Sequence, residues 1–186
     1  MPSKLNVDRA ARALLAGGVV AYPTEAVYGL GCLPGRRDAV HRLLAVKRRS
    51  WRKGLLLIGA NLAQVERFAV LPPEPRRSEI LQTWPGPVTW VLEARPGVPN
   101  WITGGRATVA VRVTSHPLSR ALCERARGAL VSTSANVSDR SPLKEPLKLR
   151  RELGRFLDYV LVGDLGGLTK PTAIKDGRTG ELLRAG

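Results

Sequence analysis

The sequence predicts an α/β protein with a twisted mixed sheet of parallel and antiparallel strands, flanked by helices. Segments with apolar residues at helical spacing alternate with short apolar runs that are typical of buried strands. In the middle and at the end of the chain, pairs of strand-like runs are separated by short turns, which favours hairpins over a purely parallel sheet. The 186 residues contain no internal repeat and no linker, so we expect one domain, 1–186.

The first third of the chain shows a regular alternation. Apolar residues at helical spacing end at Gly17-Gly18, a helix-stop signal, and residues 19–22 then form an apolar strand. We expect Asp38 to cap a second helix that ends near the cations at 47–49. The run Leu55-Leu56-Leu57-Ile58 predicts a fully buried strand.

The remaining elements are predicted by the same signals. We expect helices at 63–68, 78–84, 117–127 and 147–156, strands at 88–92, 108–113, 130–131 and 159–162, and a closing hairpin around Asp176-Gly177. Residues 95–106 are rich in proline and glycine and predict a loop.

The stretch Pro23-Thr24-Glu25-Ala26-Val27-Tyr28-Gly29-Leu30-Gly31 follows the first buried strand directly. Proline donates no ladder hydrogen bond, so we expect the strand to end here and a polar loop to begin. The two glycines would allow unusual backbone angles and the close approach of a ligand. A polar loop at the end of a buried strand is a common ligand site, although a simple capped turn explains the same residues.

The charge of the chain suggests a polyanionic partner. Thirty Lys and Arg stand against fifteen Asp and Glu, a formal net charge of +15. Between Arg36 and Lys53 there are eight cations and one acid, Asp38, so the charge is concentrated in one region, as expected for a surface that binds nucleic acid or nucleotide phosphates. A general adaptation of the proteome or of solubility would also produce a basic chain.

Several classes of protein are disfavoured. No apolar run approaches the roughly 20 residues of a membrane span, and the first residues carry no apolar signal core, so we expect a cytoplasmic protein. Two cysteines and two histidines lie in no metal-binding spacing, and we expect no metal held by protein ligands. The chain has no GxxxxGK[ST] motif, no complete GxGxxG and no GxSxG, which excludes the usual nucleotide loops and a serine hydrolase of the elbow type.

Three polar clusters are the candidate site. Thr24-Glu25, Lys47-Arg48-Arg49 and Ser132-Thr133-Ser134-Ala135-Asn136 each follow a predicted strand or helix. Cations neutralise phosphate oxygens, and hydroxyl and amide groups orient a sugar, a phosphate or Mg²⁺. Arg112 lies among apolar neighbours in a predicted strand, so it either reaches the edge of the sheet or meets an anion.

The motifs PTEAVYGLG, Lys47-x-Arg49, KGLLLI, WPGPVT, AVRVTSHP and STSAN, in this order and spacing, closely resemble the threonylcarbamoyl-AMP synthase family with its YrdC-like domain. The resemblance extends to PTAIKDGRTGELLRAG at the end of the chain and matches the short bacterial form. Any one motif is weak evidence, whereas PTEAVYGLG, KxR and STSAN together are specific.

The resemblance implies a twisted mixed sheet with a basic concave face, and an activity. Such enzymes use ATP, L-threonine and bicarbonate, and they release pyrophosphate with threonylcarbamoyl-adenylate. A partner complex then transfers the threonylcarbamoyl group to the adenosine beside the anticodon of certain tRNAs. The resemblance also implies Mg²⁺ bound with ATP, and binding of tRNA or other RNA on the basic face.

The resemblance further implies roles for individual residues. Thr24 would contact the threonine substrate, Arg112 would pair with its carboxylate, and Thr172 would lie close to it. Lys47 and Arg49 would bind the ATP phosphates and take part in catalysis. Ser132, Ser134 and Asn136 would make the other contacts with the nucleotide.

Some positions depart from the family pattern. Ile58 stands near where many members have a substrate-contacting histidine, and Asp139 stands where the family has glycine. Glu25 stands where many relatives have aspartate, and it would either orient a neighbouring cation or cap the loop. The alternative function, a non-catalytic RNA-binding factor in ribosome or tRNA maturation, is favoured by the 36–53 run and by the basic 147–156 helix.

Overall fold

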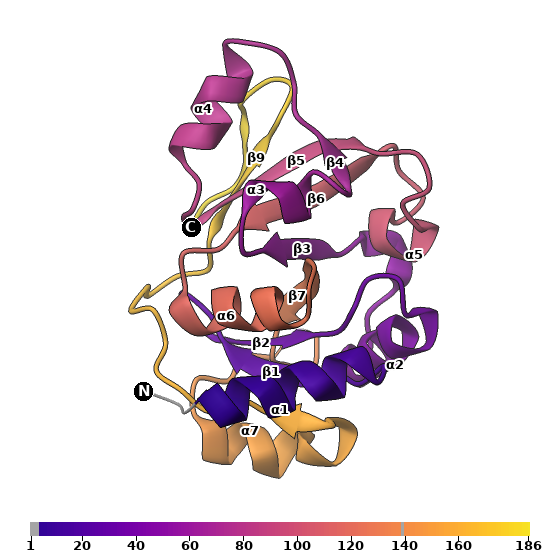
Figure 1. Cartoon of the computed structure of the whole chain (residues 1–186), viewed down its shortest axis with the longest axis vertical. Helices are drawn as coiled ribbons and strands as arrows, with labels where there is room; N and C mark the ends of the chain where they lie inside the picture. The colour runs from indigo at the N-terminus through magenta and orange to yellow at the C-terminus, as the bar shows by residue number, and fades with distance from the viewer. Residues whose placement is uncertain (1–3, 139) are drawn as a thin grey trace.

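The structure, a computed structural model, describes residues 4–138 and 140–186 and contains one mixed sheet (Figure 1). Across the sheet the strands run in the order β10 (Leu182–Arg184), β9 (Ala173–Asp176), β5 (Val88–Ala94), β6 (Thr108–Val113), β3 (Leu56–Gly59), β7 (Leu130–Ser134), β2 (Tyr28–Gly31), β1 (Val20–Pro23) and β8 (Tyr159–Val160). A short strand, β4 (Ala69–Val70), pairs with β5. The pairs β3–β6, β5–β9 and β1–β8 are parallel and the others antiparallel, which confirms the predicted mixed sheet.

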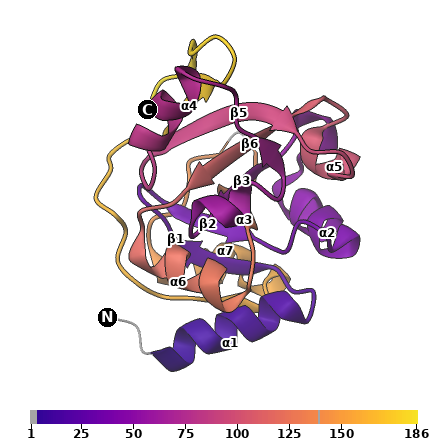
Figure 2. The same ribbon diagram turned by 45° about the horizontal axis from the view of Figure 1, so that its top comes forward.

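Helices flank this sheet (Figures 1 and 2). In Figure 1, α1 (Lys4–Leu15), α6 (Pro117–Arg125) and α3 (Leu62–Val65) lie on the side of the sheet that faces the viewer. The others are α2 (Arg37–Lys47), α4 (Arg76–Gln82), α5 (Asn100–Thr103) and α7 (Pro146–Leu153), with the 3-10 turns η1 (Trp51–Lys53) and η2 (Gly154–Phe156). None of the helices in the described part of the chain combines the length and apolar content needed to cross a bilayer.

Two apolar clusters form the core. One joins α1 and α6 to the strands and includes Val7, Leu14, Tyr22, Ile58, Leu122 and Leu130. The other includes Leu43 of α2, Leu57, Ile80, Trp90, Val111 and Val131. Burying each of these large side chains stabilises the fold by about 1.5–3 kcal/mol relative to exposing it, so the two clusters hold the central strands rigidly.

Some local expectations hold only in part. Strand β1 ends at Pro23 and a polar loop follows, as expected, but the loop is limited to residues 24–27 because Tyr28–Gly31 forms β2 and pairs with β1. Neither Gly29 nor Gly31 has a positive φ. A Cβ at Gly31 would lie 2.4 Å from the Val131 carbonyl oxygen, so close packing of β2 on β7 requires that glycine. Helix α2 begins at Arg37, so Asp38 lies in its first turn and Arg36 occupies the cap position.

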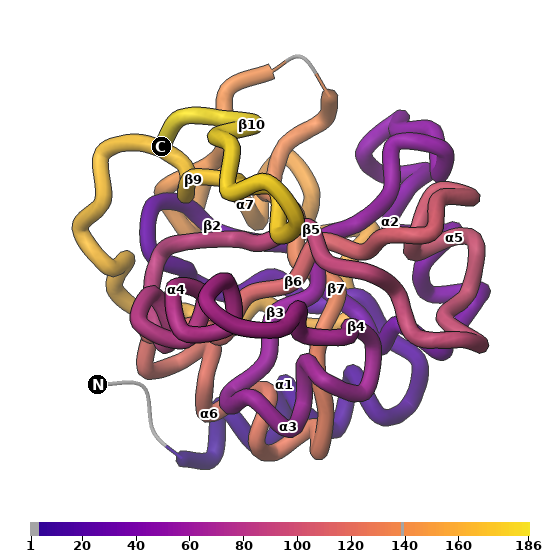
Figure 3. The backbone as a smooth tube through the Cα atoms, turned by 90° about the horizontal axis from the view of Figure 1, so that it is seen from above, coloured from indigo at the N-terminus to yellow at the C-terminus, as the bar shows by residue number. Residues whose placement is uncertain are grey.

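Several element lengths also differ from the sequence expectation. The expected strand at 159–162 is limited to 159–160, and a four-residue helix, α5, forms inside the expected loop at 95–106. The expected helix at 147–156 divides into α7 and η2. The hairpin around Asp176-Gly177 is present as β9 and β10 and lies beside β5 (Figure 3).

Candidate active site

A cavity of about 390 Å³ opens on the central strands, within the range typical of small-molecule sites. The strand register builds its floor. Leu56 of β3 lies between Ala110 of β6 and Ser132 of β7, and Ser134 of β7 lies opposite Gly29 of β2. Since paired residues present their side chains on the same face of a sheet, these positions line one continuous surface.

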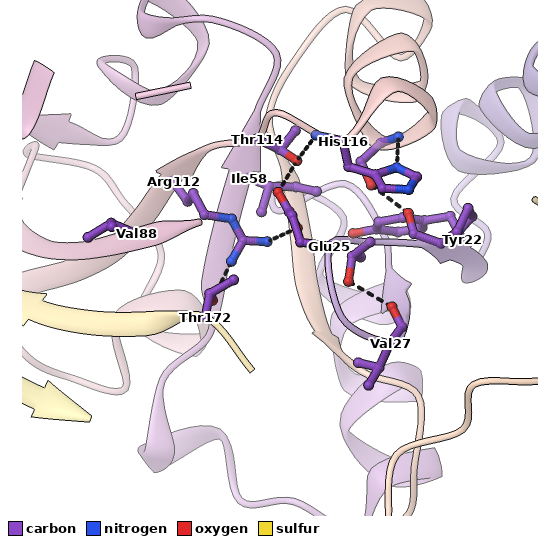
Figure 4. Close-up of polar contacts among 12 residues, drawn as sticks. Tyr22, Glu25, Val27, Ile58, Val88, Arg112, Thr114, His116 and Thr172 are labelled. Carbon is purple, nitrogen blue, oxygen red and sulfur yellow. Dashed lines mark hydrogen bonds and ion pairs between the residues drawn. The ribbon is translucent and has the colours of Figure 1, made fainter. Parts of the chain in front are cut away.

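One end of the cavity, which we call the closed end, is lined by Arg112 and Thr172; Glu25 also holds the Arg112 guanidinium but does not line the cavity (Figure 4). Arg112 is only 3% exposed; its Nη2 donates to Glu25 Oε2 at 3.0 Å, and its Nη1 donates to Thr172 Oγ1 at 2.6 Å. The second carboxylate oxygen of Glu25 accepts from Thr114 Oγ1 at 2.7 Å. A buried arginine needs such partners, because an unpaired charge away from water is costly.

The segment 161–172 runs along one side of the molecule from β8 to β9 and brings Thr172 to the closed end (Figures 1 and 3). The amides of Gly166 and Leu168 donate to the Thr24 and Glu25 carbonyls, at 3.0 and 2.9 Å. A Cβ at Gly166 would lie 2.8 Å from the Glu25 Cα, so glycine allows this close approach.

His116 also holds this segment. Its Nε2 lies 3.1 Å from the Asp164 carbonyl oxygen, and its Nδ1 accepts from the Ser119 amide at the start of α6. These contacts fit the neutral ring protonated on Nε2. Burial lowers the pKa of His116 below its usual value.

The opposite end, which we call the open end, carries Arg49, Lys53 and Arg106. Lys53 and Arg106 are exposed, and Arg49 is half-buried. Arg49 Nη2 donates to the Gly54 carbonyl at 3.1 Å, while its buried Nε has no partner among the described residues. Burial and then repulsion from Arg106 lower the pKa of Arg49, so two like charges face the same space.

Arg184 of β10 lines the cavity as a fifth cation, beside the closed end. Its Nη2 donates to the Thr172 carbonyl at 2.7 Å. Burial and then repulsion from Arg112 lower the pKa of Arg184. The described residues that line the cavity include no Asp or Glu, and the space they enclose therefore favours an anion with charge at two separate points.

Lys47 lies beneath the open end. It is 2% exposed, and its Nζ donates to the Ser134 carbonyl, to the Asn136 carbonyl at 2.9 Å and to Asn136 Oδ1 at 3.1 Å. Ser134 Oγ donates to the same amide oxygen, and Asn136 Nδ2 donates to the Val137 and Arg140 carbonyls. Burial, and to a lesser degree the Arg49 charge, lowers the pKa of Lys47 to about 8.

Arg48 explains why Lys47 and Arg49 diverge. It ends α2 in the left-handed conformation, with φ of 49°. The amides of Arg48 and Arg49 donate to the Ala45 and Leu44 carbonyls, a helix-ending motif that reverses the chain. Lys47 therefore hydrogen-bonds to the 134–136 segment, while Arg49 lines the cavity.

The structure brings most of the predicted site residues together. Six of them line the cavity: Thr24, Arg49, Arg112, Ser132, Ser134 and Thr172. Lys47 and Asn136 do not line it. The Thr24 hydroxyl donates to the Val27 carbonyl at 2.7 Å and thereby also stabilises the hairpin loop.

The structure also bears on the departures from the family pattern. Glu25 orients a neighbouring cation, Arg112, which is one of the two roles that the sequence left open. Ile58 is fully buried beside Arg112 on the neighbouring strand and does not line the cavity (Figure 4). The expectation about Asp139 lies outside the described residues.

Sequence reasoning missed part of the site. Lys53 had a signal, because it belongs to the 36–53 run and to KGLLLI. Arg184 lies in the matched terminal segment but was not singled out, and Arg106 lies in a glycine-rich loop where nothing marked it. Thr114 and His116 belong to the AVRVTSHP motif, and only their contacts with Glu25 and Asp164 connect them to the site.

Within residues 4–138 and 140–186, no group of three or more His, Cys, Asp or Glu side chains is placed to hold a metal ion. A cation at this site would therefore need oxygen ligands from a bound phosphate and from hydroxyls such as those of Ser132 and Ser134.

The fold and a cationic cavity on its central strands define a family. Residues 12–186 match the profile of the Sua5/YciO/YrdC family, described as telomere recombination. The chain is 53% identical over 179 residues to the threonylcarbamoyl-AMP synthase of Halorhodospira halophila, covering 96% of this chain and 94% of that protein. It is 50% identical over 182 residues to the enzyme of the same name from Methylococcus capsulatus, covering 98% of each. The chain belongs to the Sua5/YciO/YrdC family.

Comparison with solved structures also places the chain in this family. The H234A/Y235A variant of P. abyssi Sua5 superimposes with a TM-score of 0.90 at 30% identity over 98% of this chain. P. abyssi Sua5 complexed with L-threonine superimposes with a TM-score of 0.87 at 30% identity over 94% of it. This chain spans about half of those proteins, 54% and 51%. E. coli YciO, at 23% identity and a TM-score of 0.86, shares the fold.

Proposed function

We propose that the chain is a threonylcarbamoyl-AMP synthase, which converts L-threonine, bicarbonate and ATP into threonylcarbamoyl-adenylate and pyrophosphate. The observation that carries the proposal is one cavity with a buried, oriented arginine at its closed end and a group of cations at its open end. Threonine has one carboxylate and ATP has a triphosphate, so the two kinds of cation match the two anionic substrates. The names of the similar proteins support the same reaction.

In this reaction the threonine amine and bicarbonate form a carbamate and release water. A carbamate oxygen then attacks the α-phosphorus of ATP, a new P–O bond forms, and the bond to pyrophosphate breaks. No nucleophile from the protein is needed. The contribution of the chain is to position the two substrates and to stabilise negative charge on the leaving group, as in other reactions at phosphorus.

The cavity suggests a role for each wall. Arg112 pairs with the threonine carboxylate, with Thr172 beside it at the closed end and Thr24 in the lining of the same cavity. Arg49 stabilises the departing pyrophosphate, with help from Lys53 and Arg106. The nucleotide lies along Ser132 and Ser134, and Lys47 contributes by fixing the 134–136 segment.

The remaining expectations belong to the same proposal. Mg²⁺ enters with ATP and is held by phosphate oxygens. The product passes to a transfer complex that modifies tRNA beside the anticodon, in the cytoplasm. Binding of tRNA would use the basic surface around residues 36–53, where exposed cations predominate.

Pyrophosphate release by the purified protein tests the proposal. It should depend on ATP, on L-threonine and on bicarbonate, and omission of any one should abolish it. Release that ignores threonine, or salt-sensitive RNA binding without any release, would overturn the proposal and favour the RNA-binding alternative.

Arg112→Ala tests the assignment of the closed end. We expect the KM for L-threonine to rise about tenfold or more, since a charge-assisted contact is lost, with a much smaller change in the KM for ATP. Equal changes in both KM values would contradict the carboxylate assignment.

A further inference from the structure

We propose that Glu25 is a positioning residue for threonine, acting through Arg112 together with Thr114. The proposal rests on the proposed function, because it takes Arg112 as the partner of the threonine carboxylate. Glu25 is 4% exposed, and it is absent from the residues that line the cavity. Any effect it has on threonine must therefore pass through a neighbour.

The carboxylate of Glu25 is held from one strand end at two points. Arg112 and Thr114 are two residues apart, so their side chains project from the same face of the chain. One carboxylate oxygen accepts from Arg112 at 3.0 Å and the other from Thr114 at 2.7 Å. Both oxygens are engaged, so the carboxylate is fixed in orientation. Because Glu25 does not line the cavity, it is not placed within reach of the substrate amine to act as its base.

The backbone of Glu25 is fixed as well. Its carbonyl accepts from Leu168 at 2.9 Å, and Gly166 packs on its Cα. Thr172, at the end of the same 161–172 segment, receives the other arm of the guanidinium at 2.6 Å. Glu25 and Thr172 thus hold the two terminal nitrogens of the Arg112 guanidinium, as the dashed contacts in Figure 4 show.

These contacts leave part of the hydrogen-bonding capacity of the Arg112 guanidinium unused. The Nε of Arg112 is buried and has no partner among the described residues, in a cavity whose lining has no acid. Glu25 neutralises part of the charge and holds one terminal nitrogen, while donor capacity of the guanidinium stays free for a second carboxylate. A preoriented fork loses little freedom when the substrate binds, so the affinity for threonine depends on Glu25.

The test compares Glu25→Gln and Thr114→Val with wild type in threonine- and ATP-dependent kinetics. For Glu25→Gln we expect the KM for L-threonine to rise about tenfold or more, the effect of losing one charge-assisted hydrogen bond, while the KM for ATP changes little. Thr114→Val should give a smaller rise of the same kind. Glu25→Asp, which keeps the charge, should recover part of the affinity.

Glu79→Gln is the matched control. Glu79 pairs with Arg76 and Lys175 at the surface, and none of the three lines the cavity, so both KM values should stay at the wild-type level. The thermal shift caused by saturating L-threonine gives a second readout, and it should shrink in Glu25→Gln even if the variant melts lower. If Glu25→Gln does not fold, the KM of Thr114→Val for L-threonine still tests the inference.

The outcomes separate this inference from the proposed function. If Arg112→Ala raises the KM for threonine and the Glu25 and Thr114 variants do not, Glu25 is only structural and the inference is wrong. If Arg112→Ala itself leaves that KM unchanged, the assignment of the closed end fails. Equal changes in the KM for threonine and for ATP in Glu25→Gln would also overturn the inference.

Discussion

The two ends of the cavity use cations in different ways. At the closed end, Arg112 is 3% exposed and is paired with a carboxylate and a hydroxyl of the protein itself. At the open end, Arg49, Lys53 and Arg106 form no ion pair among the described residues, and two of them are exposed. The cation at the first end is held by two side chains, whereas Arg49 and Arg106 at the second end contact only backbone carbonyls.

The difference matches the chemistry of the two substrates. A small amino acid offers one carboxylate, and a fixed fork recognises its position with little loss of freedom. A triphosphate carries several charges that move apart as pyrophosphate leaves, and long flexible cations can follow that charge. A residue at the closed end should therefore control mainly KM, and one at the open end mainly kcat.

Arg49→Ala should have the largest effect and tests the role of the open end. We expect kcat for pyrophosphate release to fall about 10²-fold or more, as when one electrostatic stabiliser is lost from a transition state. The KM for threonine should change far less. Single-turnover measurements with saturating substrates would check this, and turnover near the wild-type level would remove Arg49 from the chemistry.

Lys47→Met tests whether Lys47 supports the 134–136 segment or acts at the open end itself. Lys47 Nζ holds three oxygens of residues 134–136, so its loss should lower the free energy of unfolding by about 2–3 kcal/mol. Arg49→Met, with the cation on the other side of the helix end, should lower kcat with little effect on stability. Denaturant unfolding combined with kinetics separates the two. A Lys47→Met variant with wild-type stability and low kcat would show that Lys47 touches phosphate directly.

His116→Asn should have the smallest effect and concerns the support of the closed end. The folded pKa of His116 lies below its unfolded value near 6.5, so the unfolded chain binds more protons as pH falls through this range. The free energy of unfolding should therefore decrease below pH 6.5, with the full contribution present above it. Asparagine keeps the helix cap, and its variant should show a weaker dependence of Tm on pH between 7.5 and 5. An unchanged dependence would mean that other groups cause the acid instability.

The identity of the residues that meet at the site was largely predictable from local patterns. Thr24, Arg112 and Ser132 each stand next to apolar residues of a predicted strand, and buried strands are where side chains enter a cavity. Arg49 belongs to the group of cations at the end of a predicted helix. The mixed sheet followed from the alternation of helical and strand periods. Patterns of this kind express interactions between residues close in sequence, and sequence alone can therefore reveal them.

Which cations face the cavity, and which are bound to other protein groups, depends on contacts between distant parts of the chain. Lys47 and Arg49 are two residues apart and look equivalent in sequence, yet the left-handed Arg48 sends one to the 134–136 segment and the other to the cavity. Glu25, in the loop between β1 and β2, meets Arg112 of β6, 87 positions away, although three strands lie between β1 and β6 in the sheet. Pairs at such separations form only when folding brings the two side chains together. Burial then removes water from both charges, so each needs the other as a partner.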